Sequence, residues 1–245
     1  MRIYITMIAL VTVVIGLVLF VFIADRQPDD ISADGSIQYT VLKNGMKVIV
    51  QENRRAPVVV TQVWYKVGGS YEHNGITGIS HVVEHMMFKG TEEIPAGKFS
   101  EIIAAHGGKE NAFTSKDYTA YFQRISSDNL ELCLSLEADR MRNLLLDEEE
   151  FIKEIEVIKE ERRLRTDDKP TSLTYERFNA VAFVNNPYRK PIIGWMEDLD
   201  TMEIDDLREW YETWYAPNNA TLVVVGDVQA KEVFALAKEY FGALK

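Results

Sequence analysis

The chain has 245 residues, and its 27 lysines and arginines against 38 aspartates and glutamates give a formal net charge of −11. Charged residues make up 27% and hydrophobic residues 47%, which excludes a disordered chain and allows a sizeable core. The negative charge argues against nucleic-acid binding, because phosphate backbones attract basic surfaces. The single cysteine, Cys133, excludes an internal disulfide and zinc sites built on paired cysteines, so a metal would need histidine and carboxylate ligands.

The N-terminal residues 3–24 contain no charged side chain. As a helix they would extend about 33 Å, which is enough to cross a hydrocarbon layer of about 30 Å. We therefore predict a transmembrane signal-anchor over residues 1–24. Because Arg2 precedes this run while Asp29 and Asp30 follow it, the remainder of the chain is expected on the extracytoplasmic side of the membrane, in the periplasm if the source is bacterial.

Two alternatives to the anchor remain. One is a cleaved secretory signal, which would leave a secreted protein, although the apolar run is long for a signal and Phe22-Ile23-Ala24 is a poor cleavage site. The other is a buried core helix. Residues 25–37 contain four aspartates and are expected to form a linker to a domain over residues 38–245.

Turn residues and apolar periodicity predict a mixed series of strands and helices in that domain. Asn44-Gly45 predicts a hairpin, and the β-branched run at 58–67 predicts a buried strand. Strands are expected at 38–42, 47–51, 58–67, 109–114, 118–125 and 222–225, and helices at 78–88, 98–106, 129–145, 148–166, 171–183, 204–214 and 229–241. This mixed order indicates an α/β or α+β fold.

The segment His81-Val82-Val83-Glu84-His85 carries the clearest chemical signal. On a helix, its two histidines and its glutamate share an arc of about 100°. Two imidazoles one turn apart can bind one zinc ion, and Glu84 would then lie beside the open metal position as a general base. The alternative is a chance pair of histidines around a glutamate on a surface helix.

A catalytic zinc ion generally takes a third protein ligand, here a carboxylate or another histidine. On the predicted helix at 148–166, Glu154 and Glu161 lie one above the other among apolar residues, whereas Glu156 and Glu160 lie on the polar side. A carboxylate that faces the core needs a partner, so we expect one of the first pair to bind metal and the other to support it. The alternative for either residue is a solvated helix face.

Together these residues resemble the pitrilysin family, which includes insulin-degrading enzyme and the mitochondrial processing peptidase β-subunit. The resemblance covers about residues 38–245 and is strengthened by a glutamate 76 residues after the second histidine. It also rests on Gly75-x-x-Gly78, Met87-Phe88-Lys89-Gly90-Thr91, Gly107-Gly108-x-x-Asn111-Ala112-Phe113-Thr114-Ser115, Pro191-x-x-Gly194 and Tyr215-Ala216-Pro217-Asn218-Asn219. It implies an α+β fold, with a mixed β-sheet flanked by helices, that forms one half of a two-half metallopeptidase.

The resemblance implies that His81, His85 and Glu161 hold zinc and that Glu84 is the general base. The supporting glutamate of the family falls on Glu154. The zinc ion, Zn²⁺, is therefore the expected cofactor.

The resemblance also places Asn111 and Ala112 in an edge strand that pairs with an extended peptide substrate. Such pairing uses backbone hydrogen bonds, which bind any sequence, and side pockets, which add selectivity. Taken alone, Asn111 also fits a turn residue after Gly107-Gly108.

We therefore expect a zinc metalloendopeptidase that cleaves peptides or proteins with zinc-activated water and a glutamate general base. The chain matches only the first half of the family's two-half chamber, so a homologous second half, in a homodimer or heterodimer, is the expected partner. The alternative is a non-catalytic or partner-dependent subunit of such an assembly, against which the four retained motif residues argue. A third interpretation is another zinc-dependent hydrolase, against which the segment around Asn111 argues.

Overall fold

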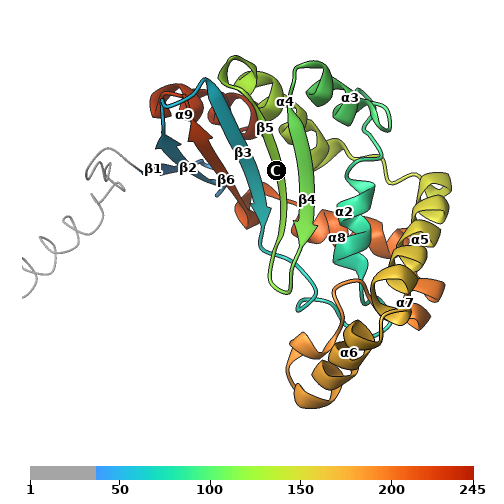
Figure 1. The fold of residues 1–245 in the computed structure, drawn as a ribbon. Helices are drawn as coiled ribbons and strands as arrows, with labels where there is room; N and C mark the ends of the chain where they lie inside the picture. The colour runs from blue at the N-terminus through green and yellow to red at the C-terminus, as the bar shows by residue number, and fades with distance from the viewer. Residues whose placement is uncertain (1–36) are drawn as a thin grey trace, which may run out of the picture.

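The protein folds around a six-stranded mixed β-sheet (Figure 1). The computed structural model describes residues 37–245, so the predicted signal-anchor over residues 1–24 and the linker up to residue 36 lie outside the described residues. The strands are β1 (Gln38–Val41), β2 (Lys47–Glu52), β3 (Val58–Tyr65), β4 (Lys109–Thr114), β5 (Thr119–Ser126) and β6 (Ala220–Gly226). Their order across the sheet is β1-β2-β6-β3-β5-β4, which leaves β4 at one edge.

The sheet combines one parallel strand pair with four antiparallel pairs. Strands β1 and β2 form the hairpin predicted at Asn44-Gly45, where Gly45 has a φ of 91° that favours glycine. The last strand, β6, lies between β2 and β3, parallel to the first and antiparallel to the second. Strand β5 pairs antiparallel with both β3 and β4. The predicted mixed sheet is confirmed.

Helices cover the sheet and extend beyond its β4 edge. The α-helices are α2 (Ile79–Met86), α3 (Lys98–Ala105), α4 (Leu130–Asn143), α5 (Glu148–Arg162), α6 (Pro170–Ala182), α7 (Met196–Thr201), α8 (Ile204–Trp214) and α9 (Ala230–Phe241). Every second residue of β3 and β6 is buried, and α4 packs against β3 and β5 while α9 packs against β2. Within residues 37–245, none of the helices is long and apolar enough to cross a membrane.

The predicted helix at 148–166 is divided in the structure. Helix α5 begins where predicted, because the Asp147 side chain accepts a hydrogen bond from the backbone N–H of Glu150 at 3.0 Å. It continues into a π-helical segment, η2 (Arg163–Asp167), of the kind that often occurs at functional sites. Helix α7 was not predicted, because its six residues are too few for apolar periodicity to identify it.

The apolar face expected for α5 is narrower than its periodicity suggests. The apolar residues among which Glu154 and Glu161 were placed on the predicted helix include Phe151, Ile155 and Ile158, and these three are buried. Three others are exposed instead, namely Ile152 and Val157 on α5 and Leu164 on η2. The reason is that α5 stands beyond the sheet edge (Figure 1), where one row of side chains meets α2 and the rest of the helix has no sheet to cover.

Helix α2 lies between the β4 edge and α5 (Figure 1). The side chain of Glu72 binds its first turn. The buried carboxylate of Glu72 accepts hydrogen bonds from the backbone N–H groups of Gly78 and Ser80, at 2.8 and 3.0 Å. Gly78 has a φ of 89°, and a Cβ there would lie 2.6 Å from the carbonyl oxygen of Ile193. The first turn of α2 is therefore fixed against the 191–195 loop. This contact sets the position of the helix and so of the histidines that it carries.

Candidate metal centre

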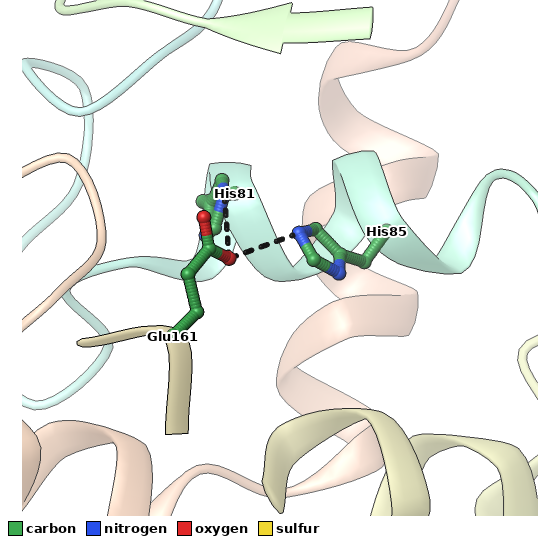
Figure 2. Close-up of side chains that lie close together, drawn as sticks. All are labelled: His81, His85 and Glu161. Carbon is green, nitrogen blue, oxygen red and sulfur yellow. Dashed lines mark ion pairs between the residues drawn. The ribbon is translucent and has the colours of Figure 1, made fainter. Parts of the chain in front are cut away.

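Two histidines of α2 and one glutamate of α5 point toward a common position (Figure 2). The Oε2 atom of Glu161 lies 3.7 Å from Nε2 of His81 and 3.5 Å from Nε2 of His85. In a tetrahedral zinc site with bonds of about 2.1 Å, ligand atoms stand about 3.4 Å apart. These separations are too long for direct hydrogen bonds and close to those of ligands around one metal ion. The three residues therefore fit a divalent metal.

The glutamates of α5 are sorted by burial as helix periodicity predicts. Glu154 is buried and Glu161 is largely enclosed, whereas Glu156 and Glu160 are exposed on the far side of the helix. The apolar neighbours that suggested this sorting are themselves partly exposed. The two inner carboxylates are enclosed because they face α2, where histidine ring nitrogens lie opposite them.

The carboxylate of Glu154 binds His85 through Nδ1, the ring nitrogen that does not face the metal position. Its Oε1 lies 2.8 Å from Nδ1 of His85, and its other oxygen is held by the ammonium group of Lys89. The hydrogen bond from His85 and the charge of Lys89 lower the pKa of Glu154 to about 2. A carboxylate that stays ionised accepts the Nδ1 hydrogen, which leaves Nε2 of His85 free to bind metal.

The first histidine is neutral in the metal-free protein. Burial lowers the pKa of His81 to about 3, because the charged imidazolium is poorly solvated there, and the charges of His85 and Arg165 add to the effect. A neutral imidazole keeps a lone pair for a metal ion. At pH 7, His81 is therefore ready to act as a ligand without first losing a proton.

Glu84 lies on the side of α2 that faces the sheet edge. Its carboxylate accepts a hydrogen bond from the hydroxyl of Thr114 at the end of β4. Burial raises the pKa of Glu84, and the hydrogen bond from Thr114 opposes this shift. A carboxylate whose pKa is raised takes up a proton more readily, which is the property required of a general base.

A groove of about 1280 Å³ runs along β4 and over these side chains. One wall is the edge strand, including Asn111 and Ala112, and the other is formed by η2, α6 and the 191–193 loop. The turn interpretation of Asn111 is therefore wrong, because this residue pairs with Phe122 in the β4–β5 ladder. Among residues 37–245, β4 pairs only with β5, so its outer edge there can add a further strand.

Three residues next to the site were not assigned roles from the sequence, namely Lys89, Thr114 and Arg165. Lys89 lies in the turn that follows the end of α2 at Met86, so helical spacing gave no signal for it. Thr114 follows Ala112 by two positions and so shares its side of the strand. Arg165 follows Glu161 by four positions, a spacing at which opposite charges pair along a helix, so its contact with Glu161 could also have been predicted, although Arg165 lies on η2.

Residues 47–195 match the family described as Insulinase (Peptidase family M16). The chain belongs to this family. Residues 201–245 match a second description, Peptidase M16 inactive domain. The resemblance drawn from the motifs is therefore confirmed.

Among curated proteins, the chain is 42% identical over 205 residues to the zinc protease PqqE of Helicobacter pylori, an alignment covering 83% of this chain and 46% of the relative. The chain spans about half the length of the curated relatives it matches.

Solved structures agree with the fold. A protease from Helicobacter pylori matches with a TM-score of 0.84 and 40% identity, covering 86% of this chain and 51% of that one. The periplasmic protease PqqL from Escherichia coli matches with a TM-score of 0.80 and 28% identity, covering 88% of this chain and 25% of that one.

Proposed function

We propose that the chain is the metal-binding half of a zinc metalloendopeptidase, with zinc held by His81, His85 and Glu161. The observation that carries this proposal is the position of Glu161 Oε2, 3.7 and 3.5 Å from the two histidine Nε2 atoms. The name of the relative PqqE, a zinc protease, supports the choice of metal. Glu154 orients the imidazole ring of His85 by accepting a hydrogen bond from Nδ1, on the side of the ring away from the metal position.

When bound, zinc would polarise a water molecule and the scissile carbonyl group. Glu84, which accepts a hydrogen bond from the hydroxyl of Thr114, would take a proton from that water. The hydroxide so formed would add to the scissile carbonyl carbon, and as the C–N bond breaks Glu84 would deliver the proton to the leaving amine.

The substrate in this proposal is an extended peptide that adds to the outer edge of β4, along Asn111 and Ala112. This support comes from the edge position of β4 and from the groove beside it. Backbone pairing would hold the peptide across the metal site. Side chains that alternate along the peptide would then point to opposite faces of the extended sheet.

The assembly and location are part of the same proposal. The relatives are about twice as long as this chain, which supports a homologous second half, in a homodimer or heterodimer, closing over the groove. The name of PqqL as a periplasmic protease and the uncharged run at 3–24 support a peptidase domain, residues 38–245, anchored outside the cytoplasm. If the second half supplies essential groups, this chain is a partner-dependent subunit.

The test is the substitution Glu84→Gln. Glutamine has nearly the same shape but takes up no proton at neutral pH, so peptide cleavage should fall by about 10²–10⁴-fold or more. Zinc content, measured by metal analysis, should stay at one ion per chain. Cleavage at the wild-type rate, or a folded preparation of the wild-type protein without bound zinc, would contradict the proposal.

A further inference from the structure

The groove beside the metal site is lined by seven charged side chains other than the histidines: Glu84, Lys116, Glu161, Arg165, Glu176, Arg189 and Lys190. Its three carboxylates are all engaged. Glu176 accepts two hydrogen bonds from the guanidinium of Arg162, at 2.8 and 2.9 Å. Glu161 faces the metal position, and Glu84 is hydrogen-bonded to the hydroxyl of Thr114.

Three of the four basic groups, by contrast, bind oxygen atoms that carry no charge. The ammonium of Lys190 donates to the backbone carbonyl of Glu72, and that of Lys116 donates to the backbone carbonyl of Lys190. The guanidinium of Arg189 lies 3.4 Å from the amide oxygen of Asn74. These contacts hold the side chains in place, while burial lowers the pKa of both lysines and the carboxylate of Glu72 acts on the charge of both. The groove therefore has four basic side chains against three acidic ones, of which Glu176 is paired with Arg162, although the whole chain carries a charge of −11.

The fourth basic group, Arg165, lies closest to the reacting groups. Its Nη1 is 2.8 Å from Oε1 of Glu161, the oxygen that does not face the histidines. Its positive charge contributes to lowering the pKa of both His81 and Glu84, so the guanidinium lies near the metal position. The side chain is nonetheless 73% exposed. A guanidinium has five N–H donors, and the contact with Glu161 uses Nη1 alone, so a side chain that lines the groove keeps other donors for a ligand.

We propose that this groove selects peptides with an acidic side chain next to the scissile bond, and that Arg165 contacts the carboxylate. The inference rests on the proposed function, because it concerns the same groove. A peptide paired with β4 would turn alternate side chains toward the η2 wall, where Arg165 lies. A carboxylate there can form two parallel hydrogen bonds with the guanidinium, whereas a lysine would be repelled.

The experiment compares peptides that differ only by glutamate, glutamine or lysine at each position around the cleavage site. The zinc-loaded chain is used in the assembly in which it cleaves peptides. At one position kcat/KM should follow the order glutamate, glutamine, lysine, with a glutamate-to-glutamine ratio of up to about five-fold for one partly exposed ion pair. The difference should lie mainly in KM and should shrink at high salt.

Variants assign the preference to a residue. Arg165→Gln should remove the glutamate preference, Arg165→Lys should keep part of it, and Arg165→Glu should favour lysine instead. Arg163→Gln is the matched control, because Arg163 pairs with the exposed Glu160 and does not line the groove. Zinc content is measured for each variant, since Arg165 touches Glu161.

A binding measurement separates this inference from the proposed function. Labelled glutamate and lysine peptides are titrated onto the zinc-loaded Glu84→Gln variant, with and without Arg165→Gln, and followed by fluorescence anisotropy. If the wild-type protein cleaves nothing but the glutamate peptide binds more tightly through Arg165, the proposed function fails and the charge preference stands. Equal binding of both peptides, or a preference that survives Arg165→Gln, overturns the inference even if cleavage is observed.

Discussion

Glu154 and His85 lie 2.8 Å apart, on the side of the imidazole ring opposite the nitrogen that faces Glu161. One ring nitrogen is therefore bound to a carboxylate while the other is directed to the metal position. The ammonium of Lys89 holds the same carboxylate, so a chain of three charged or polar groups fixes the orientation of this histidine. Such a partner makes a ligating histidine more basic and restricts its rotation.

The substitution Glu154→Gln should weaken zinc binding by about 10–100-fold. Glutamine keeps the size of the side chain but loses the negative charge that polarises Nδ1–H of His85. Glu150→Gln is the control, because Glu150 also pairs with Lys89 but contacts neither histidine. Zinc affinity is measured by competition with a chromophoric chelator, and equal losses in the two variants would refute the role assigned to Glu154.

The substitution Glu161→Gln should weaken zinc binding more than Glu154→Gln, by more than about 100-fold, because it removes a ligand rather than the partner of a ligand. Glu160→Gln should have little effect, since the Glu160 side chain is 58% exposed and, in the described part of the chain, its ion pair is with Arg163. Metal analysis after gel filtration checks both variants. If their effects were exchanged, the third ligand would be wrong by one residue.

Much of the site could be predicted from local sequence, because its parts follow helix and strand periods. The spacing of His81 and His85 put both rings on one face of α2, and the seven-residue separation of Glu154 and Glu161 put both carboxylates on one face of α5. Local spacing did not decide whether Glu154 or Glu161 lies opposite the metal-binding nitrogens of the histidines. That depends on how α5 packs against α2, and only the family resemblance selected Glu161 in advance.

Other features depended on contacts between distant segments. The hydrogen bond from Thr114 to Glu84 joins the end of β4 to α2, two segments 30 residues apart whose packing local spacing does not predict. The exposure of Ile152 and Val157 was also not predicted. A hydrophobic pattern shows which side of a helix faces the core, but not how much of that side other elements cover.

The pKa of His81 predicts how the metal-free protein responds to acid. Its folded-state value, about 3, lies below the usual 6.5, so the unfolded chain binds more protons between these values. The contribution of His81 to the free energy of unfolding is therefore fully present above about pH 6.5. It is lost as the pH falls from there toward 3. Urea unfolding in the presence of a chelator should show this loss, with a slope from this group of up to about 1.4 kcal/mol per pH unit. His81→Asn should reduce the slope, and an unchanged slope would mean that His81 titrates normally.

The last prediction concerns the open groove. Without a second half, a peptide on β4 would remain exposed to water, which weakens electrostatic contacts at the metal and leaves the scissile bond poorly oriented. The chain alone should therefore bind one zinc ion yet cleave peptides at least about 100-fold more slowly than the complete assembly. Helix α6 supports this expectation, because none of its residues is buried and Tyr175, Phe178 and Val181 are exposed on it. Such an apolar surface favours association with another chain.

The measurement compares peptide turnover before and after a homologous half is added, as a separate chain or by covalent linkage, at constant zinc content. Addition of that half should restore cleavage, and light scattering should show a defined complex. The Glu84→Gln chain mixed with the same half is the control, because it should form the complex without gaining activity. If the chain were monomeric and already as active alone as in the complex, the two-half requirement would be wrong while the metal site would stand.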